Sequence, residues 1–366
     1  MGQVRLFTGV GKPFQICHFP DAKPVGSEIL VRIRCCTLCR SDLHSWNGKR
    51  HTPIPGVLGH EITGDILEFG PEANRRDALG RICWPGDRIT WCVTAGCGSC
   101  FFCQHGITQK CQNLRKYGHE RFEEIDPYRG GLAESILLWP GTGWMKLPDP
   151  IPDEIAATLN CSVATASAAL RLAGTLRNQC VVILGAGLLG LMATALAHEA
   201  GASSVIVLDP LESARSRAQE FGASHTMPPE QNLATTLVHQ LTDQRGADAV
   251  LEMSGSSDAV QLGISLLRTG GTMVLAGTVS PVQPVLLDPE HIVRRMLTLR
   301  GLHNYQVGDL VTAVQFLERT LDAYPWQKLI GARFSLHEVE LAFQWSIKHP
   351  GQRAAIYPLW EGLDEG

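Results

Sequence analysis

Four cysteines in one short segment have the spacing of a metal site. Cys97, Cys100, Cys103 and Cys111 form the pattern C-x-x-C-x-x-C-x7-C, the densest cysteine cluster in the chain. Four thiolates so spaced can surround one Zn²⁺ and leave no open coordination position, which is typical of a structural site. The same four donors also suit an iron–sulfur cluster. The residues alone therefore indicate a metal and leave zinc and iron–sulfur both open.

A glycine-rich turn has the pattern of a dinucleotide site. Gly185, Gly187 and Gly190 have the spacing G-x-G-x-x-G, directly after the apolar run 181–184 and directly before the helical run 188–200. Such glycines allow a tight turn, a close approach of the backbone to a pyrophosphate, and close packing of helix on strand. We therefore expect the phosphates at this turn.

The residues that follow the turn extend this prediction. Leu188 and Leu189 begin the helix, so their N–H groups should face the phosphates. Asp209 ends the next apolar strand, 205–208, and a carboxylate there can accept hydrogen bonds from the adenosine ribose. It would also repel a 2′-phosphate, which favours NAD over NADP. The alternative is that Asp209 only ends a strand and begins a turn.

A second set of possible metal donors is dispersed. Cys39 lies in Cys-Arg-Ser-Asp-Leu-His, His60 and Glu61 lie in Gly-His-Glu, and Cys161 lies in Leu-Asn-Cys-Ser-Val-Ala-Thr-Ala. No local spacing rule joins these segments. Periodicity alone would leave Cys161 as a core thiol.

The elements that must position these residues change in character along the chain. Up to about residue 150, short β-branched runs such as 29–33 and 61–67 are broken by Gly, Pro and Asp, which predicts a mostly antiparallel domain. The segment 147–152 carries three prolines and predicts a boundary. Beyond it, apolar strands alternate with helical stretches, which predicts a parallel sheet covered on both faces. The last part contains the helical candidates 309–321 and 336–348 and the strand candidate 354–357.

Composition excludes several classes of protein. The chain has 366 residues, 32 Lys and Arg against 36 Asp and Glu, and a net charge of −4, which gives no reason to expect a nucleic-acid binder. The first residues lack an apolar signal core, so we expect a cytoplasmic protein with reduced thiols. The apolar run 181–197 is long enough to suggest a membrane helix, but its glycines are explained by the dinucleotide pattern, and no membrane partner is expected.

Taken together, the motifs resemble the zinc-dependent medium-chain alcohol dehydrogenases over nearly the whole chain. The Gly59-His60-Glu61 block, the four-cysteine segment, Gly86-Asp87-Arg88 and the glycine fingerprint appear in family order. The resemblance implies an α/β fold, with a doubly wound Rossmann sheet and a GroES-like, mostly β catalytic domain. We expect the catalytic domain over 1–152, with a structural zinc lobe at 97–111. The NAD-binding domain should cover 153–300, and 301–366 should return to the catalytic domain.

The resemblance also joins the dispersed donors. Cys39, His60 and Cys161 resemble the three protein ligands of a catalytic zinc, and Glu61 resembles the carboxylate that can approach that metal. Three ligands leave a fourth position for substrate. With the four-cysteine lobe, this implies two Zn²⁺ per chain. Asp42 resembles the carboxylate that orients His60.

Further residues are assigned by the same resemblance. Ser41 and His44 resemble a hydroxyl and an imidazole of a proton relay. Thr165 resembles a contact near the nicotinamide, and Arg353 resembles a pyrophosphate contact. Arg215 could reach the adenosine, and Ser254 and Gly277 follow strands at the edge where a dinucleotide lies; each arginine could instead be a surface charge. The segment 297–302 is similar to the strand through which family members pair, which implies a homodimer or homotetramer.

Basic residues near the first cysteine bear on the substrate. Arg40 follows Cys39, and Lys49, Arg50 and His51 lie in the next loop, a local excess of positive charge in an acidic chain. It suggests an anionic substrate group, or else side chains that are solvated or face the cofactor phosphates. The loop is similar to one in a subgroup associated with phosphonate catabolism, which points to a hydroxyalkylphosphonate. Alternatives are a polyol or amino-alcohol dehydrogenase of the sorbitol or threonine type, and a catalytically silent relative that binds NAD.

Overall fold

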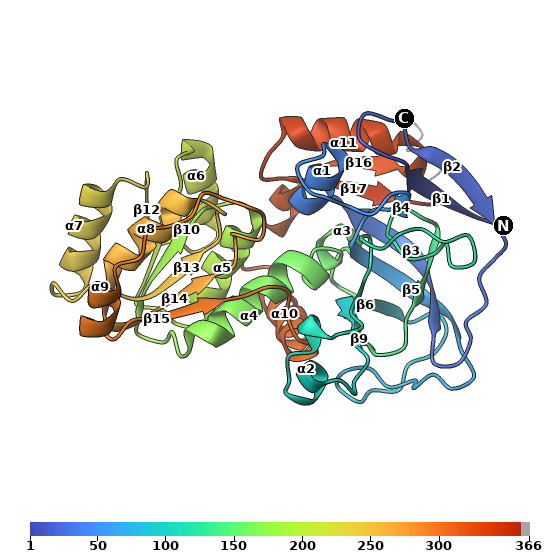
Figure 1. Ribbon diagram of the computed structural model, residues 1–366, viewed down its shortest axis with the longest axis horizontal. Coiled ribbons are helices and arrows are strands. Elements are labelled where there is room, and N and C mark those ends of the chain that lie inside the picture. The colour runs from blue at the N-terminus through green and yellow to red at the C-terminus, as the bar shows by residue number, and fades with distance from the viewer. Residues whose placement is uncertain (360–366) are drawn as a thin grey trace. The chain divides into compact units, whose positions relative to one another are not determined.

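The computed structural model describes residues 1–359 and divides the chain into two compact units (Figure 1). The first unit contains residues 1–161, 306–321 and the part from 326 onward; the second contains 162–305 and 322–325. The first change of unit falls at Cys161, later than the prolines at 147–152 and the expected limit of 152, because α3 (Asp153–Ala156) still packs on the strands of the first unit.

The first unit is built from two sheets. One has the order β2-β1-β4, and the other is eight-stranded with the path β16-β17-β3-β5-β6-β7, with β8 on β3 and β9 on β6. The strands are β1 (Gly2–Phe7), β2 (Gln15–Phe19), β3 (Ile29–Thr37), β4 (Gly56–Val57), β5 (Glu61–Phe69), β6 (Arg88–Ala95), β7 (Arg115–Lys116), β8 (Ser135–Leu138), β9 (Thr142–Lys146), β16 (Ile330–Ser335) and β17 (Arg353–Tyr357). Their pairing is antiparallel except for β16 on β17.

Burial along the strands explains why this sheet forms. In the centre of β3, buried Val31 and Ile33 alternate with the exposed Arg32 and Arg34, the pattern of a strand with one face on the core. The core beneath it joins residues from both ends of the chain, among them Val4, Trp91 and Phe343. The last strand, β17, pairs directly with β3, so the carboxyl-terminal part completes the sheet that the first residues begin.

Short helices connect these strands. They are α1 (Arg40–Trp46), α2 (Phe101–Gln104), α3, α10 (Val307–Thr320) and α11 (Val339–Lys348), with 3-10 turns at Thr108–Lys110, Trp326–Leu329 and Leu336–Glu338 and a π-helical turn at Leu159–Val163. The helix expected at 336–348 therefore begins as a 3-10 turn, in which Ser335 and Glu338 form a reciprocal cap.

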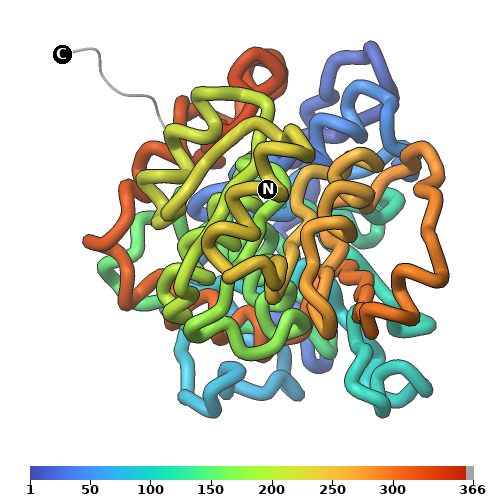
Figure 2. Tube along the Cα trace, turned by 90° about the vertical axis from the view of Figure 1, so that its left-hand side faces the viewer, coloured from blue at the N-terminus to red at the C-terminus, as the bar shows by residue number. Residues whose placement is uncertain are grey.

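The second unit is one parallel sheet with the order β12-β11-β10-β13-β14-β15. Its strands are β10 (Cys180–Leu184), β11 (Ser204–Leu208), β12 (His225–Met227), β13 (Ala247–Glu252), β14 (Leu267–Leu275) and β15 (Thr298–Gly301). Its helices are α4 (Ala164–Ala173), α5 (Leu188–Glu199), α6 (Glu212–Glu220), α7 (Gln231–Leu241), α8 (Ser257–Leu266) and α9 (Pro289–Arg294). In Figure 2 the chain of this unit runs from green through yellow to orange.

This strand order is that of a doubly wound Rossmann sheet. Successive strands are added on one side of β10 up to β12 and on its other side from β13 onward, so the topological switch point lies between β10 and β13. Helices cover both faces, since α7 and α8 bury Val238 and Leu266 against β10 and β13 while α5 packs against β10 and β11. The fold class expected from the sequence is confirmed. The apolar run 181–197 is a buried strand, a turn and a helix.

One other helical stretch passes a simple test for a membrane span. Asp153–Ala173 is long and apolar enough by length and composition, but 72% of the window is buried inside the protein. Such burial is that of a helix within a protein core.

Candidate functional site

The dispersed donors come together in the first unit. The ligand atoms of Cys39, His60 and Cys161 all lie within 4.8 Å of one another. The two sulfurs are 3.9 Å apart, and Nε2 of His60 lies 3.5 Å from Sγ of Cys161. Two thiolates and an imidazole are donors that Zn²⁺ prefers, and three protein ligands leave one tetrahedral position. The donor set therefore fits a catalytic zinc.

Each donor stands at the end of an element. Cys39 precedes the first turn of α1, and His60 immediately precedes β5. Cys161 lies in the π-helical turn between α3 and α4, and such turns are frequent at functional sites. His60 is buried and the two cysteines are half-buried, so the donors are held by the core and still partly open to solvent.

Asp42 fixes two of these donors at once. Its carboxylate accepts a hydrogen bond from the backbone N–H of Cys39 at 2.9 Å, which caps α1, and from that of Gly59 at 3.2 Å. It also lies 3.1 Å from Nδ1 of His60. A carboxylate on Nδ1 leaves Nε2 to face the sulfurs, the arrangement that a metal-binding histidine requires.

The charges around the three donors favour a thiolate. The hydrogen bond with Cys161 lowers the pKa of Cys39 well below its ordinary value, while the same contact raises the pKa of Cys161. Burial would lower the pKa of His60, but Asp42 and the Cys39 sulfur raise it to about 10. These shifts favour a thiolate at Cys39 and a protonated His60, and a cation that binds there competes with the protons.

Glu61 lies beside the donors but is held by other residues. Its side chain is fully buried and accepts hydrogen bonds from Thr37 at 2.7 Å and from Arg353 at 2.8 and 2.9 Å. Nη2 of Arg353 also lies 3.7 Å from the Cys39 sulfur. Burial raises the pKa of Glu61, and Arg353 opposes that effect. The structure thus places Arg353, assigned from the sequence to a pyrophosphate, on Glu61 and Cys39.

The two relay candidates, Ser41 and His44, lie on α1. The Ser41 hydroxyl is 3.3 Å from Nε2 of His60. His44 lies one turn further along the helix and is half-buried. Burial, followed by the charges of Arg40 and Lys49, lowers the pKa of His44, which favours its neutral, proton-accepting form.

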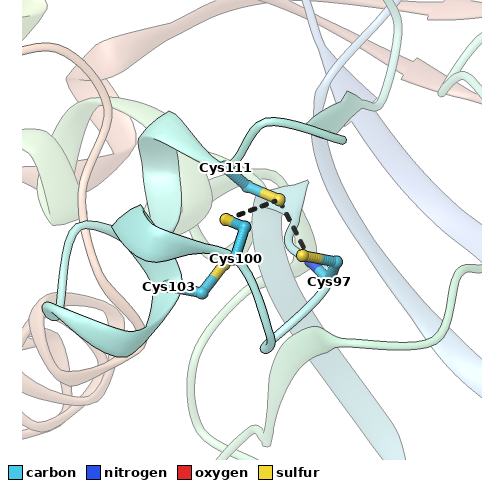
Figure 3. A group of neighbouring side chains, drawn as sticks. All are labelled: Cys97, Cys100, Cys103 and Cys111. Atoms are coloured by element: carbon cyan, nitrogen blue, oxygen red, sulfur yellow. Dashed lines mark hydrogen bonds between the residues drawn. The ribbon is translucent and has the colours of Figure 1, made fainter.

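The four clustered cysteines form a separate group (Figure 3). Sγ of Cys100 lies 3.8 Å from Sγ of Cys111, and the backbone N–H groups of Cys97 and Asn113 point to the same sulfur at 3.2 and 3.3 Å. Hydrogen bonds from Ser99 lower the pKa of Cys97 to about 6, whereas burial raises that of Cys103 to about 12. All four ligand atoms lie within 4.8 Å of one another, which fits a closed tetrahedral zinc.

The glycine turn lies at the point where the Rossmann sheet reverses. Gly185 has φ +98°, and a Cβ there would lie 2.8 Å from that of Ser254, so only glycine fits. A Cβ on Gly190 would meet the carbonyl oxygen of Gly185 at 1.9 Å, which explains the close packing of α5. A Cβ on Gly187 would meet nothing within 4 Å, and no side chain among residues 1–359 caps this helix. The N–H groups of Leu188 and Leu189 therefore begin the helix beside open space, which suits a phosphate.

Of the other residues predicted to bind the cofactor, five belong to the second unit: Thr165, Asp209, Arg215, Ser254 and Gly277. The Asp209 carboxylate accepts hydrogen bonds from the N–H groups of Ala186 at 2.8 Å and Leu211 at 2.9 Å. Arg215 donates to the carbonyl oxygens of Asp209 and Pro210. Ser254 and Gly277 follow β13 and β14, and Thr165 is half-buried in the first turn of α4.

The basic residues expected near the substrate are only partly enclosed. Arg40, Lys49 and His51 are exposed, and Arg50 is half-buried. The N–H of Arg50 donates to the His44 carbonyl oxygen at 3.0 Å, so its loop folds back on α1.

Sequence reasoning missed several residues near these groups. Thr37 holds Glu61, and His119 places its ring 4.9 Å from that of His60. Lys116 interacts electrostatically with Arg50, Cys39 and Cys161. In the second unit, the buried carboxylate of Glu252 accepts hydrogen bonds from the N–H groups of Ser254, Gly255 and Gly277 and orders both loops. The run Lys-Tyr-Gly-His-Glu, polar and aromatic around a glycine, is a signal that could have drawn attention to 116–120.

Known proteins resemble the chain over both units. Two protein-family models match the sequence. The family model for the alcohol dehydrogenase GroES-like domain matches residues 26–149, and the family model for the zinc-binding dehydrogenase domain matches residues 189–319. The L-threonine 3-dehydrogenase of Deinococcus radiodurans is 30% identical over 344 residues, 92% of each chain. That of Pyrococcus furiosus is 32% identical over 259 residues, 70% of each chain.

Solved structures of dehydrogenases are similar to this chain over almost its whole length. An alcohol dehydrogenase from Thermotoga maritima has a TM-score of 0.91 and 29% identity, covering 98% of this chain and 99% of that one. A zinc-binding dehydrogenase from Sinorhizobium meliloti, bound to NADP, has a TM-score of 0.81 and 27% identity, with coverage of 98% and 99%. The predicted oxidoreductase class, with zinc and a nicotinamide dinucleotide as cofactors, is confirmed. The chain belongs to the zinc-dependent medium-chain alcohol dehydrogenase family.

Proposed function

We propose that this protein catalyses reversible hydride transfer between a small alcohol or aldehyde and NAD at a zinc held by Cys39, His60 and Cys161. The convergence of these three donors, from segments up to 122 positions apart, is the observation that carries the proposal. A second zinc, held by the four-cysteine group, would stabilise a segment with little core of its own.

When bound, zinc supplies a Lewis acid that lowers the pKa of an alcohol hydroxyl and polarises a carbonyl. The residues of the chain do the rest. Asp42 holds His60 with Nε2 toward the sulfurs, and Ser41, beside that nitrogen, is placed to receive the hydroxyl proton. His44, whose pKa is lowered, then accepts a proton near solvent. Glu61 keeps a buried negative charge near the donors while Thr37 and Arg353 hold it.

For the cofactor we propose NAD. Both oxygens of Asp209 accept backbone hydrogen bonds, so the carboxylate is fixed beside the glycine turn, where it would repel a 2′-phosphate. Arg215 is fixed on the same segment and is the residue most able to weaken this preference.

For the substrate we propose an anionic alcohol such as a hydroxyalkylphosphonate. Arg40, Lys49, Arg50 and His51 place positive charge on α1 and the loop after it. The threonine dehydrogenases among the relatives favour a second candidate, an amino alcohol.

The assembly is also a proposal. β15 is the edge strand of the Rossmann sheet, and the segment before it exposes Leu286, Val293 and Met296, with 88%, 73% and 74% of their surfaces accessible. An edge strand flanked by exposed apolar side chains suits pairing with a second copy. We propose a homodimer or homotetramer in the cytoplasm, with no nucleic-acid or membrane partner.

The test combines metal analysis with a substrate panel. The purified protein should hold two zinc ions per chain and produce NADH from at least one of four alcohols: ethanol, a polyol, L-threonine or 2-hydroxyethylphosphonate. One zinc per chain, lost on replacing Cys100 but not Cys161, together with no NADH from any alcohol, would establish a silent NAD-binding relative instead.

A further inference from the structure

Glu252 carries a buried carboxylate at the switch point of the Rossmann sheet. It ends β13, where it lies in register with Leu184 of β10 and Leu275 of β14. The residue is fully buried, and the contacts of its carboxylate within residues 1–359 are hydrogen bonds from N–H and O–H groups rather than ion pairs. A carboxylate without water is stable only where such donors replace it. The donors must therefore stay in place around Glu252.

This one carboxylate joins two loops. Its Oε1 accepts hydrogen bonds from the N–H groups of Ser254 at 2.7 Å and Gly255 at 2.6 Å, and from the Ser254 hydroxyl at 2.8 Å. Its Oε2 accepts a hydrogen bond from the N–H of Gly277 at 3.2 Å. Ser254 and Gly255 follow β13, whereas Gly277 follows β14. Because the acceptor is charged, these bonds hold both loops more strongly than bonds between neutral groups would.

The two loops also touch each other and the glycine turn. A Cβ on Gly277 would lie 2.5 Å from the backbone nitrogen of Gly255, so these two backbones are in contact. A Cβ on Gly185 would lie 2.8 Å from the Cβ of Ser254, so the loop after β13 also packs on the turn after β10. Since such packing leaves no free space, a shift of one loop must move its neighbours. The bonds of Glu252 therefore affect the whole edge of the sheet at the switch point.

The place of these loops indicates which part of the cofactor they meet. The two halves of a Rossmann sheet bind the two halves of a dinucleotide, on either side of the switch point. Asp209 follows β11, and a carboxylate there faces the adenosine ribose, so the half formed by β10, β11 and β12 takes the adenosine. The loops after β13 and β14 then face the nicotinamide half.

We propose that Glu252 is a positioning residue that fixes the loops after β13 and β14 for the nicotinamide half of NAD. This inference rests on the proposed cofactor site and extends it to a residue that acts through Ser254, Gly255 and Gly277. Glutamine tests the role, because its amide has one accepting oxygen and one donating NH2 group. In either orientation the NH2 group would face an N–H donor of one loop. Glu252→Gln should therefore release one of the two loops while the size of the side chain is kept.

The binding test compares NAD with AMP, which lacks the nicotinamide half. Both are titrated by calorimetry into the zinc-loaded protein. Glu252→Gln should weaken NAD binding about tenfold, the typical effect of one hydrogen bond to a charged group, and leave the affinity for AMP unchanged. Asp248→Asn is the matched control, because its carboxylate near the other end of β13 also accepts a backbone N–H, that of Cys180 at 2.8 Å. This control should lower Tm without changing the ratio of the two affinities.

Hydrogen exchange of the wild type gives a measurement that needs no variant. The N–H groups of Ser254, Gly255 and Gly277 should be protected before NAD is added, because Glu252 already holds them. Rapid exchange of these groups without NAD would overturn the proposal. So would an equal loss of NAD and AMP affinity in folded Glu252→Gln protein, or no loss of either. These results would leave the proposed function standing. A wild type that binds NAD with protected loops but oxidises no alcohol would contradict the proposed function and keep the role of Glu252.

Discussion

The two cysteine groups of this chain are candidate metal sites of opposite design. The four-cysteine group takes all its donors from one segment, 97–111, and its first cysteine is exposed. The three-donor group takes Cys39, His60 and Cys161 from segments far apart in the sequence, and its histidine is buried. A site built from one loop can form wherever that loop is placed, whereas the dispersed site exists only when the first unit is folded.

Their surroundings differ in the same way. Backbone N–H groups surround the sulfur of Cys111, and such dipoles stabilise thiolates without any charged partner. Buried charges surround the three-donor group, with Asp42 on His60 and Arg353 between Glu61 and Cys39. Dipoles suit a closed site that only holds a metal, and charges with an adjacent hydroxyl suit a site where protons move.

Removing one donor from each group is the strongest test of this difference. Cys161→Ser should reduce zinc from two to one per chain and lower kcat/KM for alcohol oxidation by roughly 10³-fold, because several kcal/mol of electrophilic stabilisation is lost. Cys103→Ser should also lose one zinc, but its main effect should be a lower Tm, since a structural zinc contributes folding energy. Zinc content, Tm and NADH formation are measured on both proteins.

The difference between the two groups would be contradicted if both variants had the same effect on Tm and on activity. If Cys161→Ser lowered Tm as much as Cys103→Ser and kept its activity, the dispersed site would be structural. Cys180→Ser is the matched control, because this buried thiol of the Rossmann sheet lies in neither group.

The sequence predicted the local features of both groups better than the long-range ones. The four cysteines and the glycine turn are short patterns, and their elements lie close to the expected ranges: the strand predicted at 205–208 is β11, Ser204–Leu208, and the helix predicted at 188–200 is α5, Leu188–Glu199. Burial and periodicity act over a few residues, so a single sequence contains that information.

The contacts of Arg353 could not be predicted from a local sequence pattern. It lies 292 positions from Glu61, and only the pairing of β17 with β3 brings the two together. The dispersed donors were joined by resemblance alone, because no spacing rule connects positions 39, 60 and 161. Lys116 and His119 were missed for a related reason, since a turn that packs through a glycine–glycine contact leaves no periodic signal.

The buried charges give a second, smaller test of the contrast. Glu61→Gln should lower the free energy of unfolding of the first unit by about 3–5 kcal/mol, because it leaves the Arg353 guanidinium buried without its carboxylate. Chemical denaturation of the zinc-free protein separates this effect from metal binding. The double variant Glu61→Gln/Arg353→Met should recover part of the loss.

Arg294→Gln is the control for that measurement. Its pair with Glu290 is exposed, with 78% and 72% of the two side chains accessible, so its removal should cost under about 0.5 kcal/mol. Equal effects of Glu61→Gln and Arg294→Gln would show that the charges at the three-donor group are solvated rather than structural.

The smallest expected effect concerns the proposed proton path at the three-donor group. The positive charge of Lys49 helps to lower the pKa of His44, so Lys49→Gln should raise that pKa. His44 accepts protons in its neutral form, and activity falls as the pH drops through its pKa. The acidic limb of kcat/KM for alcohol oxidation should therefore move to higher pH in the variant, and NMR titration of His44 should show the same direction. Because Lys49 is exposed, high salt should reduce the difference between the two proteins. Unchanged profiles at low salt would remove His44 from the relay and leave Ser41 to pass its proton directly to water.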